Sequence, residues 1–323
     1  MICDHPGIKH LNTYVVIVTY NGSAWIRLAL ESLRGSQAPC TTIVVDNASS
    51  DETVGIVKSE FPEVQLLPQT ENTGFGIGNN IGIGHAIRAG AEFIFLLNQD
   101  AYVTPTTIGD LTGFLSEHEA YALVSPLHCS PDLTCVDPQT QSRYLQGYAP
   151  QYLSDACIGS VREYYDIRGI NAAAWMARAA AFKVAGGFDP LFFMYGEDDD
   201  LIARFSHLGQ KFALLPACRV VHLRAKSARP KPDIFREIWA LSERARSDLL
   251  VDAKLPGGSL AGKIIRLLAN GVGMPILRMF VTHNWREAIA YPVATLRVLL
   301  QFNAVLGSAR RCAVPGPHFL DIS

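Results

Sequence analysis

The sequence lacks the marks of a secreted, disulfide-bonded or membrane-embedded protein. Its seven cysteines, at positions 3, 40, 129, 135, 157, 218 and 312, are odd in number and scattered, and no CxxC pair occurs. No signal peptide is recognisable, so we expect reduced thiols in the cytosol. No stretch offers about 20 uninterrupted apolar residues, which argues against a transmembrane helix.

Two common nucleotide-binding motifs are also absent. There is no GxxxxGK[ST] sequence, and the first predicted strand ends in Thr19-Tyr20-Asn21-Gly22 where a nicotinamide-dependent oxidoreductase needs GxGxxG. A glycine-rich segment at 72–80 contains only GxGxxN, and it does not follow the first strand. We therefore expect its glycines to let the backbone approach a ligand, with Asn79 opening the next helix.

The 323 residues, 49% of them hydrophobic, suffice for one large domain with an appendage or for two domains. The net charge of −2 hides an asymmetry. Residues 1–203 carry 10 Lys and Arg against 23 Asp and Glu, whereas residues 204–323 carry 18 against 7. A basic C-terminal part suggests a polyanionic partner, either nucleic acid or an anionic membrane surface.

The N-terminal half alternates between strand and helix patterns. Apolar, β-branched runs predict strands at 13–20, 41–46, 64–67, 92–97 and 122–125. Helical segments are predicted at 23–34, from 49 to about 61, at about 79–89 and from 104. This alternation indicates an α/β fold with a parallel sheet, in which ligands bind beyond the carboxyl ends of the strands.

That rule selects polar residues at three strand ends. They are Thr19-Tyr20, Asp46-Asn47 and Asn98-Gln99-Asp100. Two strands thus end in a carboxylate on the same edge of the sheet. Aspartates at strand ends also start ordinary turns, so neither acid alone identifies a site.

A run of four acids, Glu197 to Asp200, follows the apolar and aromatic stretch at 192–195. The run opens a helix, because Leu201, Phe205 and Leu208 recur with helical spacing and Gly209 follows. Acids at a helix N-terminus stabilise it by about 0.3–1 kcal/mol each, which explains one or two of them. Four acids beside apolar residues suggest the wall of a pocket.

With these residues in order, the chain resembles the inverting glycosyltransferases of family 2, which have the GT-A fold. The matching segments are VVIVTYNG at 15–22, VVDNASSDET at 44–53, ENTGFGIGNN at 71–80, FLLNQDA at 95–101 and GGFDPLFFMYGEDDDL at 186–201. The last two most resemble the rhamnosyltransferase-like branch. The resemblance covers about residues 12–228 and implies a Rossmann-like, mostly parallel sheet flanked by helices that binds a nucleotide sugar.

The resemblance also implies domain limits. A catalytic domain would span residues 1–230, with a donor half at about 12–125 and an acceptor half at about 126–230. A helical, basic region at 231–323 would follow.

Site residues follow position by position from the resemblance. In the donor half, Thr19, Tyr20, Asp46 and Asn79 would contribute to the nucleotide site, and Asn98-Gln99-Asp100 would occupy the family's DxD position. Asn98 replaces the usual first Asp, which leaves Asp100 as a ligand of a divalent metal, Mg²⁺ or Mn²⁺.

In the acceptor half, His222 would complete the metal site, although a histidine among apolar residues is more often a core residue. Arg224 and Lys226 could neutralise phosphate.

The acid run would carry the catalytic base. Asp198 falls at the base position, Glu197 would help to shape the site, and Asp200 would pair with Arg204. Crowding by neighbouring acids should raise the pKa of Asp198. The implied reaction is an inverting, metal-dependent single displacement.

The resemblance implies dTDP-L-rhamnose as the donor and a surface polysaccharide or glycolipid, including a lipid-linked glycan, as the acceptor. A UDP-sugar donor, galactofuranose or N-acetylglucosamine, is the alternative within the enzyme class. A catalytically degenerate membrane scaffold is the alternative outside it, but such a protein would have lost acids that are present here.

The C-terminal third has helical patterns with interleaved Lys and Arg, which suit helices lying in a membrane interface. The alternative is a helical subdomain packed on the catalytic domain or on a second subunit. Stacking aromatics expected of a single-strand nucleic-acid binder are not interleaved there, so we expect no nucleic-acid partner. We expect a cytoplasmic protein that is peripheral on the inner face of the cell membrane.

Overall fold

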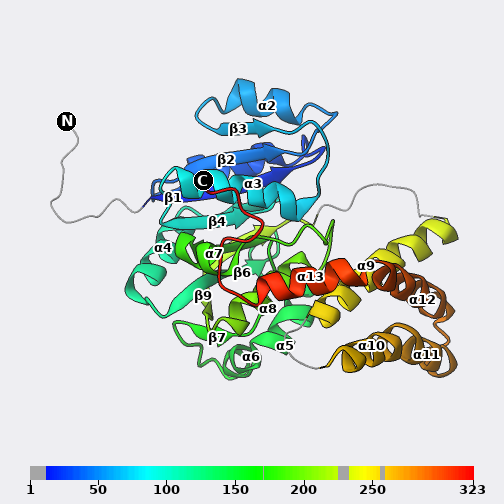
Figure 1. Cartoon of the computed structure of the whole chain (residues 1–323). Helices are drawn as coiled ribbons and strands as arrows, with labels where there is room; N and C mark the ends of the chain where they lie inside the picture. The colour runs from blue at the N-terminus through cyan, green and yellow to red at the C-terminus, as the bar shows by residue number, and fades with distance from the viewer. Residues whose placement is uncertain (1–11, 170, 225–232, 255–258) are drawn as a thin grey trace, which may run out of the picture.

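The computed structural model describes residues 12–169, 171–224, 233–254 and 259–323 (Figure 1). The strands are β1 (Thr13–Thr19), β2 (Thr41–Asp46), β3 (Gln65–Pro68), β4 (Phe93–Leu97), β5 (Ala101–Val103), β6 (Tyr121–Cys129), β7 (Tyr165–Ile167), β8 (Ala174–Arg178) and β9 (Lys211–His222). The helices of the α/β part are α1 (Ile26–Arg34), α2 (Thr53–Glu60), α3 (Phe75–Arg88), α4 (Thr107–Glu117), the π-helical segment η1 (Thr140–Leu145), α5 (Gln146–Tyr148), α6 (Pro150–Cys157), α7 (Ala179–Ala185) and α8 (Glu197–His207).

Within the described residues these strands form one mixed sheet with the order β3-β2-β1-β4-β8-β6-β9-β5, and β7 pairs with β9. Strands β3, β2, β1 and β4 are parallel, as predicted. Beyond β4 the sheet departs from the expected mostly parallel arrangement, because β8 lies antiparallel between β4 and β6. Strand β5 is antiparallel to β9 as well. The GT-A-type α/β fold is therefore confirmed, with a more mixed sheet than predicted.

The sheet is buried on both faces, which explains the continuous apolar strands. Helices α1, α2 and α4 cover one face, where Ile17, Leu30 and Leu111 belong to one core cluster. Helices α3, α7 and α8 cover the other, where Val16, Ile83 and Phe205 belong to a second cluster. Helix α8, which carries the acid run, is therefore anchored on the sheet by its apolar side.

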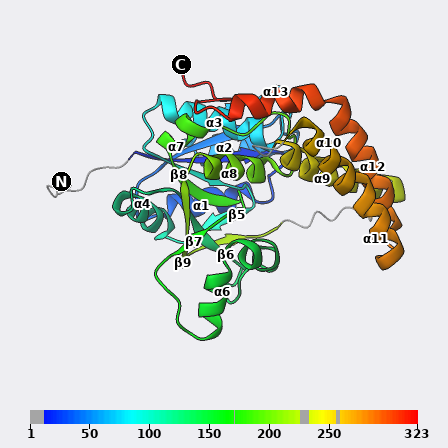
Figure 2. The same cartoon turned by 60° about the horizontal axis from the view of Figure 1, so that its bottom comes forward.

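The C-terminal region is helical, as predicted. It contains α9 (Ile234–Lys254), α10 (Leu260–Leu268), the π-helical segment η2 (Ala269–Gly273), α11 (Met274–Thr282), α12 (Trp285–Leu300) and α13 (Phe302–Cys312). Figure 2 shows α9 to α12 gathered on one side of the α/β part. The chain then returns to that part, where Gly187 donates a backbone hydrogen bond to the carbonyl of His318 (2.8 Å).

One helical stretch differs from the expectation that no transmembrane helix is present. By length and composition the continuous helix Leu260–Thr282 could cross a membrane, and only 17% of its most apolar window is buried. The sequence argument required uninterrupted apolar residues, whereas Lys263, Arg266 and Arg278 are spread along an otherwise apolar helix. A single such helix is weak evidence for a membrane span.

Candidate active site

The carboxyl edge of the parallel strands brings the predicted residues together. Thr19 ends β1 and its hydroxyl donates to Asp46 Oδ1 at the end of β2 (2.8 Å). Asp46 also accepts from the backbone and the hydroxyl of Ser49 (2.9 and 2.6 Å). Thr19 and Asp46 are buried. This hydrogen-bonded pair fixes the loops after both strands.

A cleft of about 590 Å³ opens at this edge. Among the described residues it is lined by Val18, Tyr20, Asn21, Trp25, Asn47, Asn72, Gly74, Phe75, Asn98, Gln99, Asp100, Met194, Tyr195 and His222. Of the residues predicted to bind the donor, Tyr20, Asn98 and Asp100 thus line the cleft. Thr19 and Asp46 lie behind the wall, next to the lining residues Tyr20 and Asn47.

Asn79 is not placed as the sequence suggested. Helix α3 begins at Phe75, with Gly74 (φ 87°) as its N-cap, so Asn79 lies inside the helix and does not open it. Its amide donates to the carbonyl of Phe75 (2.9 Å), and the residue is buried. It is absent from the residues described as lining the cleft.

The glycines of α3 serve mainly to bring the helix close to the sheet, contrary to the predicted approach to a ligand. A Cβ atom at Gly82 would lie 2.3 Å from Val16 Cγ1 of β1, and one at Gly78 would lie 2.8 Å from Val18 Cγ1. Gly74 is different, since it lines the cleft.

Asp100 and His222 meet at the floor of the cleft. Asp100 directly precedes β5, and His222 ends β9. These two strands pair with Ala101 opposite His222, and Asp100 Oδ1 lies 3.3 Å from His222 Nε2. His222 Nδ1 and Asn98 Oδ1 are buried and have no hydrogen-bond partner within the described part of the chain. The described residues contain no group of three or more His, Cys, Asp or Glu placed to hold a metal.

This pair fits a divalent cation only if other ligands come from a bound molecule. Hard cations such as Mg²⁺ keep several oxygen ligands from water and substrate phosphates and use one or two carboxylates of the protein. A carboxylate and an imidazole beside a cleft of this size match that requirement. The cation would thus be held jointly by Asp100, His222 and a diphosphate.

A smaller cavity of about 240 Å³ adjoins the cleft. Its described lining residues are Phe75, Asn98, Gln139, Arg143, Tyr144, Asn171, Ala172, Ala173, Met194, Tyr195, Gly196, Glu197, Asp198, His222 and Arg224. Five of them, Phe75, Asn98, Met194, Tyr195 and His222, also line the cleft. A molecule in the cleft and one in the cavity would therefore meet at these shared residues, and Asp198 lines the smaller cavity.

The acid run begins α8, as predicted, with Gly196 in the left-handed conformation (φ 78°) at its N-cap. Asp198 accepts backbone hydrogen bonds from Asp199 (3.0 Å) and Ala172 (3.4 Å). Glu197 is buried, and its Oε2 has no hydrogen-bond partner among the described residues. Two carboxyl groups are thus presented to the smaller cavity by one helix turn.

Burial raises the pKa values of both carboxyl groups, because it disfavours the charged form. Burial, followed by the negative charge of Asp199, raises the pKa of Asp198. Burial, followed by the charge of Asp198, raises the pKa of Glu197. The direction predicted for Asp198 agrees, but burial is the first cause, and of the neighbouring acids Asp199 is the one that raises its pKa. A carboxyl group with a raised pKa is suited to take a proton near neutral pH.

The other two acids of the run have separate partners. Asp200 Oδ2 accepts from Arg204 Nε (3.0 Å), which confirms the predicted pair. Asp199 Oδ2 lies 3.5 Å from Nη2 of Arg143, a residue of the segment η1. Arg143 and Tyr144 belong to a segment whose Pro, Gln and Tyr content carries no motif, so sequence reasoning missed both. Only the fold shows that they line the smaller cavity.

Arg224 lines the smaller cavity, but its guanidinium already has partners. It donates to both carboxylate oxygens of Asp137 (2.7 and 2.6 Å) and to Gln139 (2.5 Å). Burial alone would raise the pKa of Asp137, but Arg224 lowers it to about 2. The contact of Arg224 with phosphate remains a prediction. Lys226 lies outside the described residues.

The fold and the joined cavities define a class of protein. An α/β sheet with polar strand ends, a carboxylate–histidine pair and a neighbouring pair of carboxyl groups is the arrangement expected of glycosyltransferases that use nucleotide sugars in a GT-A fold. Fold comparison agrees. The mannosyltransferase PcManGT from Pyrobaculum calidifontis, solved with GDP-Man and Mn²⁺, has a TM-score of 0.55 and 16% identity. The alignment covers 94% of this chain and 80% of that one.

The family follows from the sequence. Residues 14–169 match the model of glycosyl transferase family 2, and the chain is similar to members of this family. It is 26% identical over 242 residues to an N-acetylglucosaminyl-diphospho-decaprenol L-rhamnosyltransferase of Mycobacterium tuberculosis, covering 68% of this chain and 78% of the relative. It is 24% identical over 220 residues to the dTDP-rhamnosyl transferase RfbF of Shigella flexneri, covering 65% and 69%. The protein is a glycosyltransferase with a nucleotide-sugar donor.

Proposed function

We propose that the protein is an inverting, metal-dependent rhamnosyltransferase. It transfers L-rhamnose from dTDP-L-rhamnose to a hydroxyl group of a surface-polysaccharide or glycolipid acceptor. The observation that carries the proposal is that Asp198 lines the cavity directly beside the cleft that Asp100 and His222 share. The donor is chosen because two curated relatives are named rhamnosyltransferases.

The cleft holds the nucleotide diphosphate of the donor, and the smaller cavity holds the acceptor. Asp198 accepts the proton of the acceptor hydroxyl as its oxygen attacks the anomeric carbon. The bond from that carbon to the diphosphate oxygen breaks, and the nucleoside diphosphate leaves with the electron pair. Because attack and departure occur on opposite faces of the sugar, the configuration inverts.

Asp100 and His222 would hold the divalent cation, and Asn98 beside them supplies no carboxylate. A bound cation acts as a Lewis acid for the negative charge of the leaving diphosphate, a contribution of several kcal/mol in typical sites. Arg224 and Lys226 are the remaining candidates for contact with phosphate. Glu197, whose pKa is raised by burial, shapes the cavity around Asp198.

The proposal includes the domain limits expected from the sequence. The donor half spans about residues 12–125, the acceptor half about 126–230, and the helical region 231–323. The helical region docks on the inner face of the cell membrane, where a lipid-linked acceptor would lie. Its support is the exposed apolar side chains of α10 to α12, such as Ile265 (66%), Phe280 (71%) and Val281 (72%), together with the exposed Arg266 and Arg278.

The donor is tested by release of nucleoside diphosphate from a panel of nucleotide sugars with Mg²⁺, Mn²⁺ or EDTA. We expect release from dTDP-L-rhamnose with either metal and a loss of at least tenfold with EDTA. Preferred turnover of a UDP-sugar, such as UDP-N-acetylglucosamine or UDP-galactofuranose, would refute the donor and keep the enzyme class. No turnover of any nucleotide sugar would favour a non-catalytic scaffold.

A further inference from the structure

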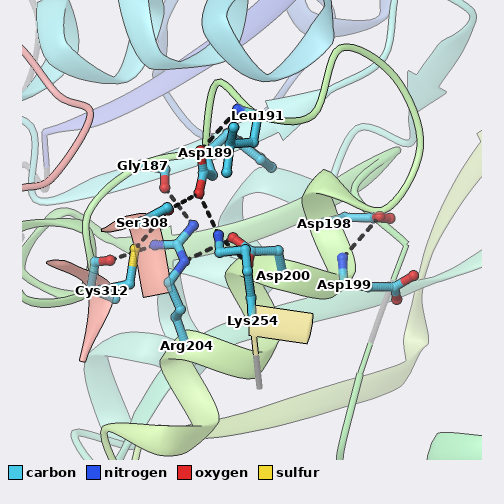
Figure 3. Close-up of polar contacts among 12 residues, drawn as sticks. Gly187, Asp189, Leu191, Asp198, Asp199, Asp200, Arg204, Lys254, Ser308 and Cys312 are labelled. Carbon is cyan, nitrogen blue, oxygen red and sulfur yellow. Dashed lines mark hydrogen bonds and ion pairs between the residues drawn. The ribbon is translucent and has the colours of Figure 1, made fainter. Parts of the chain in front are cut away.

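The loop that carries the catalytic carboxylates is closed at its base by one buried lysine. The loop begins at Asp189 and ends at Asp200 in the first turn of α8. Lys254, the last residue of α9, places its ammonium group against Asp189 Oδ2 and 2.5 Å from Asp200 Oδ1. Figure 3 shows this ammonium between the two carboxylates. The side chain of Lys254 is only 3% exposed.

Further groups complete this cluster, and none of them lines the cleft or the smaller cavity. Asp200 also accepts from Arg204, whose other nitrogens donate to the carbonyls of Ala185 (2.5 Å) and Gly187 (2.6 Å). Asp189 also accepts from the backbone of Leu191 (2.9 Å) and from the hydroxyl of Ser308 in α13. Two carboxylates and two cations are therefore buried together. Removing Lys254 alone would leave a buried negative charge without its partner.

Helix α9 also contacts the middle of the loop. Ser247 donates to the carbonyl of Met194 (3.3 Å), and the guanidinium of Arg244 lies 5.0 Å from the centre of the Tyr195 ring. Positions 244, 247 and 254 lie on one face of α9, since they are three and seven residues apart. Met194 and Tyr195 line both cavities. One helix face thus holds the loop at several points.

The backbone of the loop needs this support. Tyr195 and Gly196 both have positive φ angles, 69° and 78°, directly before Glu197 and Asp198. A tyrosine seldom adopts that conformation, and it persists where the surrounding structure determines it. The contacts from α9 lie on either side of this turn, which aims the catalytic carboxylates.

We propose that Lys254 is a positioning residue for sugar transfer. By joining Asp189 to Asp200 it fixes the loop that presents Asp198 and forms the shared wall of the two cavities. This inference rests on the proposed role of Asp198 as the base. It assigns to the C-terminal helices a part in the active site that is separate from any contact with a membrane.

The test compares three variants of the full-length protein by kcat, KM for the donor and thermal unfolding. Lys254→Met should lower kcat by about 10²-fold, the usual effect of misplacing a reacting group by about 1 Å, and change the donor KM less than threefold. The charge-balanced Asp189→Asn/Lys254→Met should recover thermal stability and keep the loss of kcat. Arg297→Met, which breaks the α12–α9 pair between Arg297 and Glu243 (2.5 Å) and leaves the described contacts between α9 and the loop in place, should keep kcat within twofold.

Two results would overturn the proposal. If the double variant recovers kcat together with stability, Lys254 only neutralises buried charge. If the single variant Lys254→Met folds and keeps kcat within threefold of wild type, the loop does not need the lysine. The double variant decides the matter even where the single variant fails to fold. Asp198→Asn, measured beside them, separates this outcome from failure of the proposed base, because retained turnover there would refute only that base.

Discussion

Asp198 and Asp199 are adjacent carboxylates with different surroundings. Asp198 lines the smaller cavity and accepts two backbone hydrogen bonds, whereas Asp199 faces Arg143. An ordinary aspartate has a pKa of about 4. Burial, followed by the charge of Asp199, raises the pKa of Asp198 above that range. A base must be ionised to act, so activity should fall in acid at a higher pH than for an exposed aspartate.

Asp199→Asn tests this electrostatic account. Removing a like charge favours the ionised form of Asp198, so its pKa should fall and the acid limb of kcat should move to lower pH by up to about one unit. Arg143, which would no longer face a charged residue at position 199, should also lower the pKa of Asp198. The profile of kcat between pH 4.5 and 9 measures the shift. A limb that stays in place or moves to higher pH would contradict the assignment of the limb to Asp198.

The pair Asp100 and His222 makes a prediction about metal. If Asp100 and His222 are the two protein ligands of a divalent cation, as proposed, Asp100→Asn removes one of them, so the Mg²⁺ concentration for half-maximal activity should rise at least tenfold. His222→Gln should act in the same direction. Titration of EDTA-treated protein with Mg²⁺ measures both. Glu119→Gln, at an exposed acid that lines neither cavity, is the control. Unchanged metal dependence in both variants would exclude this pair as the site.

At the scale of elements, the close approach of α3 to β1 positions the cleft. Gly82→Ala should destabilise the protein by about 1–3 kcal/mol, because its Cβ would lie 2.3 Å from Val16 Cγ1. Gly113→Ala in α4 is the matched control. A Cβ there meets no described atom within 4 Å, so alanine should stabilise by up to about 1 kcal/mol. Urea unfolding of both variants measures the difference, and equal effects would contradict this packing.

The elements also show how far sequence reasoning reaches. The strand ends at Asp46 and Asp100 and the helix opened by Glu197 follow from local patterns, and they were predicted. The antiparallel β8 was missed, since its pairing with β4 and β6 depends on distant segments. The start of α3 was misplaced by four residues because glycines that usually mark a loop here permit close packing. Lys254 carries no local signal at all, because its partners are 54 and 65 residues away.

At the scale of the molecule, the C-terminal helices combine exposed apolar residues with exposed arginines. If they dock on anionic membranes, the protein should co-sediment with vesicles containing anionic lipid at low salt, and less at high salt. Phe280→Ser should weaken this binding at least tenfold, since burying a phenylalanine contributes about 1.5–3 kcal/mol. Arg266→Gln should weaken it about fivefold, near 1 kcal/mol for one basic residue.

Lys58→Gln, on the exposed side of α2, is the electrostatic control and should leave vesicle binding unchanged. Binding that resists high salt and carbonate would instead indicate insertion of the Leu260–Thr282 helix. No binding to anionic vesicles at low salt would refute the membrane surface as a partner. These helices would then serve only to hold the catalytic loop.

The measurement that tests the central claim most directly is the turnover of Asp198→Asn with its donor affinity. Loss of the general base should lower kcat by about 10²–10⁴-fold. The donor dissociation constant should stay within threefold, because the cleft is lined by other residues. Nucleoside diphosphate release with acceptor and calorimetric titration of donor give the two quantities. Turnover within tenfold of wild type would contradict the account.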